Sequence, residues 1–175
     1  MKRILTILTG ILVSLVLVAK DKVEVDFFVR TFCDRNEIHS GDSTLVSYVL
    51  YATAPFAKVD CKTEMKVKNA RVRALNINRR SAQGRTVENG TVYYTMVWEQ
   101  YVVACDKVGG IRIPSLQFEA EFQFRRRPRT PFEDFFGSSE PPLTVRKKAR
   151  NEEAEISVKE KPLRSSRELL REGGI

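Results

Sequence analysis

The sequence predicts an all-β protein, an immunoglobulin-like β-sandwich preceded by an N-terminal signal or anchor segment and followed by a charged C-terminal tail. Three observations support this fold class. Apolar and polar side chains alternate from Val23 onward, which is the period of a strand with one buried face. Turn residues separate these runs, and apolar residues show no helical period between Val23 and Phe124. Several short strands at this spacing are typical of two packed sheets.

The individual strands follow from the same alternation. The longer ones are expected over residues 23–29, 44–52, 91–98 and 118–124. Residues 65–68 and 71–75 are expected to form one or two shorter strands, and residues 111–113 another. Residues 44–52 carry apolar side chains on both faces, which is compatible with burial on both sides. Asn89-Gly90 readily adopts the positive φ angles of a tight hairpin turn, and Gly109-Gly110 predicts another turn. The run after Asn89-Gly90 is rich in aromatic and β-branched residues, so we expect it to be the central strand.

The N-terminus has the pattern of an export signal. Lys2 and Arg3 form a short cationic head, and residues 4–19 contain no charge. The apolar run is close to the upper limit of a signal peptide and slightly shorter than the ~20 residues that span a bilayer. Residues 1–19 are therefore either a signal peptide cleaved after Ala19 or a retained anchor. In both cases the rest of the chain is expected in the periplasm or at the outer face of a bacterial inner membrane.

Length and charge define one domain and a tail. The chain has 175 residues and a formal net charge of +8, which fits a single core with charged ends. Residues 143–145 are compatible with a closing strand and residues 156–158 with an edge strand, but the segment beginning at Arg146 has too few apolar residues to fold alone. We therefore place the sandwich domain at residues 22–145 and a charged, partly disordered tail at 146–175.

Three cysteines, Cys33, Cys61 and Cys105, lie in the exported part of the chain. Disulfides persist in oxidising compartments, and we predict a bridge between Cys61 and Cys105, which lie at two strand ends. Three buried small apolar side chains are the alternative. No CxxC pair occurs and His39 is the only histidine, so we predict no metal site, no cofactor and no redox motif.

A basic and aromatic segment follows Phe124. Arg125, Arg126 and Arg127 precede residues 131–137, in which three phenylalanines surround two carboxylates: Phe132, Glu133, Asp134, Phe135 and Phe136. Large aromatic side chains on a loop either fold back on the domain or meet a partner, because exposing them forfeits the hydrophobic gain. These eight residues are our candidate partner-binding site.

Four segments of the chain resemble the BatD family, the oxygen tolerance proteins of the Bacteroides aerotolerance operon. They are residues 40–50, residues 89–98, the segment Val108-Gly109-Gly110-Ile111-Arg112-Ile113-Pro114, and Pro131 to Gly137, which is the most specific. Members of the family are large exported proteins with several sandwich domains and a C-terminal membrane span. This chain has one predicted domain and no second apolar run, so the resemblance implies a short relative or a fragment. It implies a role in a membrane-associated stress or aerotolerance complex with von Willebrand A-type proteins, and it implies no catalytic residue.

Two other classes of function are the alternatives to that expectation, an enzyme and a domain that binds polyanions or membrane surfaces. Hydrolytic chemistry requires a nucleophile with an oriented base, and the sequence has neither a nucleophile elbow nor a partner for His39, so we predict no enzyme and no small-molecule substrate. The basic runs at residues 125–129 and 146–150 are compatible with binding a polyanion or a membrane surface. Export argues against a specific nucleic acid as the partner.

Overall fold

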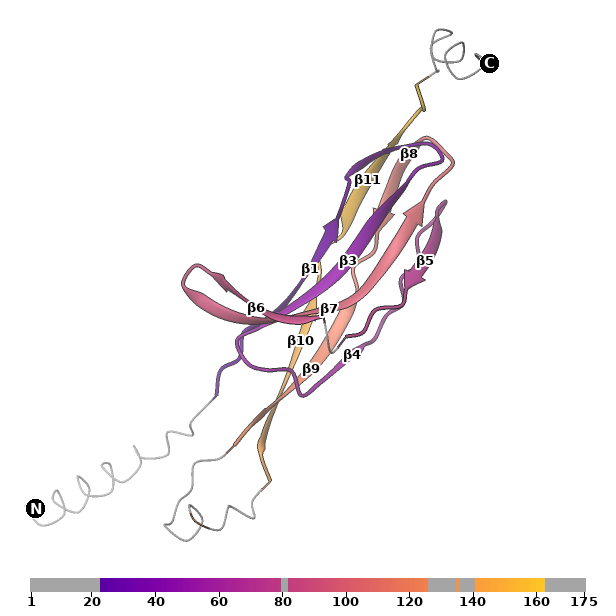
Figure 1. Cartoon of the computed structure of the whole chain (residues 1–175). Helices are drawn as coiled ribbons and strands as arrows, with labels where there is room; N and C mark the ends of the chain where they lie inside the picture. The colour runs from indigo at the N-terminus through magenta and orange to yellow at the C-terminus, as the bar shows by residue number, and fades with distance from the viewer. Residues whose placement is uncertain (1–22, 80–81, 126–134, 136–140, 163–175) are drawn as a thin grey trace, which may run out of the picture.

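The computed structural model describes residues 23–79, 82–125, 135 and 141–162. The described chain folds into an all-β sandwich, which confirms the predicted fold class (Figure 1). Its strands are β1 (Phe27–Cys33), β2 (Glu37–His39), β3 (Ser43–Ala52), β4 (Lys58–Cys61), β5 (Arg71–Leu75), β6 (Gln83–Glu88), β7 (Thr91–Ala104), β8 (Gly109–Ile113), β9 (Gln117–Phe124), β10 (Leu143–Arg150) and β11 (Ala154–Lys159).

One layer is a five-stranded antiparallel sheet. Its order is β1-β3-β7-β5, and β6 pairs with the first half of β7. The second layer consists of two three-stranded sheets, β10-β9-β4 and β2-β11-β8. These two sheets lie end to end, because β8 continues into β9 and β10 continues into β11 after short breaks (Figure 1).

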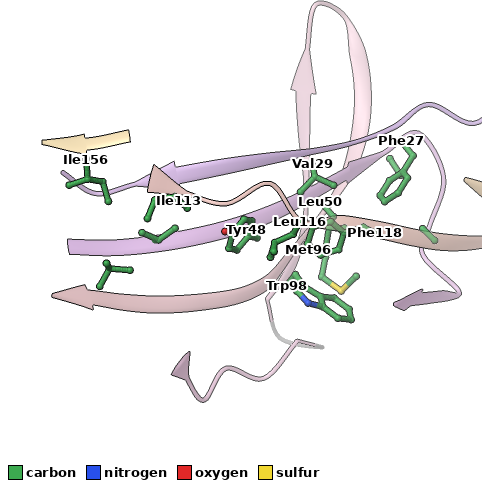
Figure 2. Close-up of a cluster of buried hydrophobic side chains, with 14 of the residues drawn as sticks. Phe27, Val29, Tyr48, Leu50, Met96, Trp98, Ile113, Leu116, Phe118 and Ile156 are labelled. Atoms are coloured by element: carbon green, nitrogen blue, oxygen red, sulfur yellow. The ribbon is translucent and has the colours of Figure 1, made fainter. Parts of the chain in front are cut away.

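The core lies between the layers. Alternate residues of β3 and β9 face each other, and Tyr48, Leu50 and Phe118 lie between the layers (Figure 2). These three side chains and Phe122 are fully buried. Ring contacts connect the layers, since Phe118 lies beside Tyr48 and edge-on to Trp98 with centroids 6.4 and 6.0 Å away. The alternation in the sequence therefore identified the inward faces of these strands correctly.

The hairpin of β6 and β7 projects from the side of the sandwich (Figure 1). Its turn is at Asn89 and Gly90, whose φ angles of 50° and 78° confirm the predicted tight turn. One face of the hairpin is attached to β1, where Glu88 accepts two hydrogen bonds from Arg30 and Tyr93 contacts the ring of Phe28. These contacts cover the outer face of β3 near Tyr51, so that end of β3 is buried on both sides.

The predicted domain boundary at residue 145 is wrong. β10 extends to Arg150 and pairs with β9 along its length, and β11 follows at Ala154–Lys159. Ile156 is fully buried, and β11 is the central strand of its sheet instead of an edge strand. The charge of residues 146–150 misled the prediction, because Arg146, Lys148 and Arg150 occupy only the solvent face of a paired strand.

Smaller differences concern strand ends. β1 begins at Phe27 and not at Val23, residues 65–68 form no strand, and Gly109 and Gly110 lie inside β8 instead of forming a turn. Val25 is nevertheless buried, so the alternation of apolar residues before Phe27 reflects packing against the core and not pairing with a neighbouring strand.

Candidate functional site

The sandwich is closed along one side and open along the other. On the closed side β1 lies beside β10, and Asn151 after β10 donates a hydrogen bond from Nδ2 to Thr31 Oγ1 of β1 at 2.8 Å. On the other side β4 and β5 are the end strands of their sheets, and the described residues contain no strand that joins them. A groove of about 610 Å³, which we call the open-side groove, lies here. Its lining residues are Val59, Asp60, Cys61, Thr63, Glu64, Met65, Arg79, Trp98, Glu99, Tyr101 and Leu116.

A β-bulge in β7 shapes one wall of this groove. The pairing between β3 and β7 shifts there, because Tyr48 is opposite Glu99 whereas Val49 is opposite Val97. Trp98 is therefore the extra residue. A bulge changes which side chains of a strand face inward. Trp98 and Tyr101 consequently both line the groove, although strict alternation would place them on opposite faces.

Arg79 holds the bulge from the outside. β5 pairs with β7 only from Gln100 onward and β6 only up to Met96, which leaves Trp98 between the two pairing segments. The Nε of Arg79 donates to the carbonyl oxygen of Trp98 at 3.0 Å, and its Nη2 donates to Glu99 at 2.7 Å. The guanidinium lies 3.9 Å from the centroid of the Trp98 ring, which adds a cation–π contact.

The far wall and floor combine polar and apolar groups. Leu116, which is 2% exposed, provides an apolar floor. Tyr101 donates a hydrogen bond to Glu99, and its pKa is raised well above that of a free phenol, mainly by burial and then by the Glu99 carboxylate. Tyr48 below it donates to Met65 Sδ at 3.1 Å, and burial raises its pKa likewise. Both phenols therefore stay neutral hydrogen-bonding groups at any physiological pH.

Replacing Arg79 by alanine is expected to expose the indole of Trp98 and to lower the free energy of unfolding by about 1 kcal/mol. Trp98 is the only tryptophan in the chain, so its fluorescence emission reports this change directly, as a shift to longer wavelength. Arg79→Lys is the matched control, because it keeps the charge and loses the fork that bonds Trp98 and Glu99 together. An unchanged emission maximum in Arg79→Ala would show that Arg79 does not cover the indole.

The sequence-predicted partner site lies mostly outside the described residues. This applies to Arg126, Arg127, Phe132, Glu133, Asp134 and Phe136. Of the other two, Arg125 is exposed after β9, and Phe135 is 84% exposed. Phe122, close to the end of β9, contacts the ring of Phe27 at 5.9 Å. The end of β9 and the start of β1 therefore lie at the same end of the domain (Figure 1).

The predicted bridge between Cys61 and Cys105 is absent, and the structure has Cys33, Cys61 and Cys105 as free thiols. Cys61 ends β4 and donates to Thr63 O at 3.1 Å. Cys105 follows β7 in the other layer, and its Sγ is 3.2 Å from both Asn69 O and Lys107 O. Spacing along the sequence does not reveal how far apart the ends of β4 and β7 lie in the fold or what each thiol faces.

Thiol labelling is expected to find three free thiols in the unfolded protein and to label Cys105 last in the folded protein, because Cys105 is 3% exposed. Burial raises the pKa of the Cys33 thiol, and the thiolate is the reactive form. Its labelling rate should therefore increase at a higher pH than that of a free cysteine. A stopped reaction followed by peptide mass spectrometry measures all three, and fewer than three labelled thiols without reductant would contradict the free-thiol state.

The basic run of β10 faces acidic partners. On the outer face of the β10-β9-β4 sheet, Arg146 is opposite Glu121 with a 2.9 Å ion pair, and Lys62 of the loop after β4 lies 3.8 Å from Glu119. A row of glutamates thus separates the cations of β10 from those near β4. The cations of β10 are therefore partly neutralised, which weakens the case for a polyanion site on this strand.

Among the described residues no group of His, Cys, Asp and Glu side chains is placed to hold a metal ion, and His39 lies 3.8 Å from Asp42 as an exposed pair. In the same part of the chain no helix has the length and apolar character needed to cross a bilayer.

Sequence reasoning missed the open-side groove. One signal for it was present, since the inward apolar residues of β7 are Met96 and Trp98 and then Tyr101 and Val103, which changes the parity of the alternation. Such a change predicts a bulge. The contribution of Arg79 had no comparable signal, because it depends on how the β5–β6 connection returns along β7.

No known protein family, curated protein or solved structure matches this chain.

Proposed function

We propose that the chain is an exported, non-enzymatic module that binds a partner protein at the outer face of a bacterial inner membrane. The observation that carries the proposal is the open-side groove, a concave surface between the unpaired edge of β4 and the bulge of β7, with an aromatic wall. Binding sites are typically concave, with an apolar interior and a few fixed polar groups. Leu116 and Trp98 form the apolar interior of the groove, and Arg79 and Glu99 are its fixed polar groups.

The location rests on the N-terminal segment. Residues 1–19 have the composition of an export signal, and the domain begins directly after them. If this segment is retained as an anchor, the end of the domain that carries Arg125 faces the membrane, because Phe27 and Phe122 contact each other at that end. The open-side groove lies along the side of the sandwich and stays accessible to a neighbouring protein.

The partner follows from the resemblance in sequence. The BatD-like segments favour a place in a membrane-associated aerotolerance or stress complex, with von Willebrand A-type proteins as partners. The aromatic loop is a second contact of this proposal. Replacing Phe135 and Phe136 by alanine is expected to weaken capture of the partner by about 2 kcal/mol and to leave the melting temperature unchanged. Reduced stability with intact capture would instead make the loop part of the core packing.

Site-specific photo-crosslinking in the bacterium that makes the protein tests the binding module. A photoreactive phenylalanine in place of Glu64, on the rim of the open-side groove, is expected to form an adduct with a membrane-associated protein. Arg112 is the matched control, because its side chain is 80% exposed on β8, away from the groove. Equal adducts from both positions, or none from position 64, would contradict binding at the groove.

A further inference from the structure

The outer edge of β4 carries unpaired backbone groups. In an antiparallel pair, hydrogen-bonded residues alternate with residues whose N–H and C=O point away from the neighbouring strand. Lys62 N donates to Gln117 O at 2.8 Å, and the register pairs Asp60 with Glu119 and Cys61 with Phe118. Asp60 and Lys62 therefore direct their backbone groups toward β9. The backbone groups of Val59 and Cys61 point to the open edge, where no strand of the described chain pairs with them.

Val59, Asp60 and Cys61 of β4 line the open-side groove. A strand added at this edge would have side chains alternating between the groove and the outer face of the sheet. On the groove side a side chain would lie over Leu116 and against Trp98, both of which are buried and apolar. The volume of about 610 Å³ is ample for one such side chain and the main chain that carries it.

The charged residues around the groove determine which side chains the added strand can carry at its outward-facing positions. The charged lining residues are three carboxylates, Asp60, Glu64 and Glu99, and one guanidinium, Arg79. Arg79 is already paired with Glu99, which leaves Asp60 and Glu64 as the acidic groups facing an added strand. Asp60 is paired with Lys58 at 3.1 Å and lies 4.0 Å from Lys62, and Glu64 is paired with Lys66 at 2.9 Å. These lysine side chains are exposed, so an incoming Lys or Arg of the added strand can displace them.

We propose that the open-side groove binds an extended segment of the partner protein as an additional β-strand on β4. The segment alternates apolar residues, which enter the groove, with Lys or Arg, which meet Asp60 on the outer face. Main-chain hydrogen bonds to Val59 and Cys61 fix its register, and the groove selects the apolar residue. This mode of recognition deepens the proposed function and rests on it.

Peptide binding to the full-length protein in detergent micelles tests this mode. The probe is a pool of blocked seven-residue peptides, Thr-Xaa-Lys-Xaa-Lys-Xaa-Thr, in which Xaa is Val, Ile, Leu or Phe. Saturable binding is expected, with the largest NMR shift changes at the amide protons of Val59 and Cys61. The same pool with the central residues N-methylated, or with Glu for Lys, is expected to bind at least about ten-fold more weakly. Equal affinity of the N-methylated pool, or shift changes confined to other strands, overturns strand addition.

A variant pair tests the edge itself. Cys61→Pro removes an outward-pointing N–H and no bond to β9, so the protein should fold and lose at least about ten-fold in peptide affinity. Cys61→Ala removes the thiol alone and should bind as the natural protein does. If Cys61→Pro does not fold, the N-methylated pool still decides the question. Loss of strand addition with a retained crosslink from position 64 would refute this binding mode and leave the proposed function standing.

Discussion

Replacing Phe118 by alanine is expected to lower the free energy of unfolding by about 4 kcal/mol, the largest effect of any single change considered for this chain. The Phe118 ring, in β9, is fully buried and contacts the rings of Tyr48 in β3 and Trp98 in the bulge of β7. Its loss removes apolar burial and leaves a cavity between the two layers, which the strands cannot close without breaking the pairing of β9 with β4 and β10.

Urea titration followed by circular dichroism measures this change. Phe124→Ala is the matched control, because Phe124 lies on the same face of β9 but is only partly buried at the strand end. Its substitution should cost clearly less, about 1 kcal/mol. Since Phe118 supports Trp98, the emission of the tryptophan should also change in Phe118→Ala and not in Phe124→Ala. A loss below about 1 kcal/mol in Phe118→Ala would mean that the two layers are not packed as described.

Asn151→Ala is expected to cost about 3 kcal/mol, because a buried polar side chain that bridges four backbone and side-chain groups is removed. Asn151 is 2% exposed at the point where β10 breaks before β11. Its Oδ1 accepts from Leu116 N at 2.7 Å, and its Nδ2 donates to Thr31 Oγ1 and Glu152 O at 2.8 Å. The alanine variant leaves the buried N–H of Leu116 without this acceptor.

Two control variants distinguish the loss of the Asn151 hydrogen bonds from the effect of any substitution at the break between β10 and β11. Asn151→Asp keeps the acceptor for Leu116 and loses the donors, so its melting temperature should lie between those of the natural protein and Asn151→Ala. Glu152→Ala changes an exposed neighbour and should stay within about 0.5 kcal/mol. Equal stability of Asn151→Ala and Glu152→Ala would show that the break between β10 and β11 is not held by this side chain.

The sequence was a good guide to the strands whose two faces differ in polarity. β3, β9 and β7 as far as Trp98 have inward apolar residues at every second position, and this alternation predicted each of them. The hairpin at Asn89-Gly90 followed from local conformational preference. These features depend on neighbours along the chain, and a sequence displays such neighbours directly.

Features set by distant pairing were not predictable in the same way. β10 is rich in Lys and Arg, and it forms a strand because β9 supplies its hydrogen bonds and Glu121 supplies a partner for Arg146. Cys61 ends β4 and Cys105 follows β7, and spacing does not reveal how far apart these strand ends lie in the fold. The open-side groove likewise combines β4, β7 and the β5–β6 connection, and its position depends on which strand edges remain unpaired.

The central claim is that a partner protein occupies the open-side groove as a strand added to β4. Competition in isolated membranes tests it most directly, with the photo-crosslinker at position 64 and the alternating apolar and lysine peptide pool as competitor. The adduct with the membrane-associated partner is expected to decrease at least about ten-fold at saturating peptide and to persist with the N-methylated pool. An adduct that is equally strong with and without the competing peptide would contradict the claim.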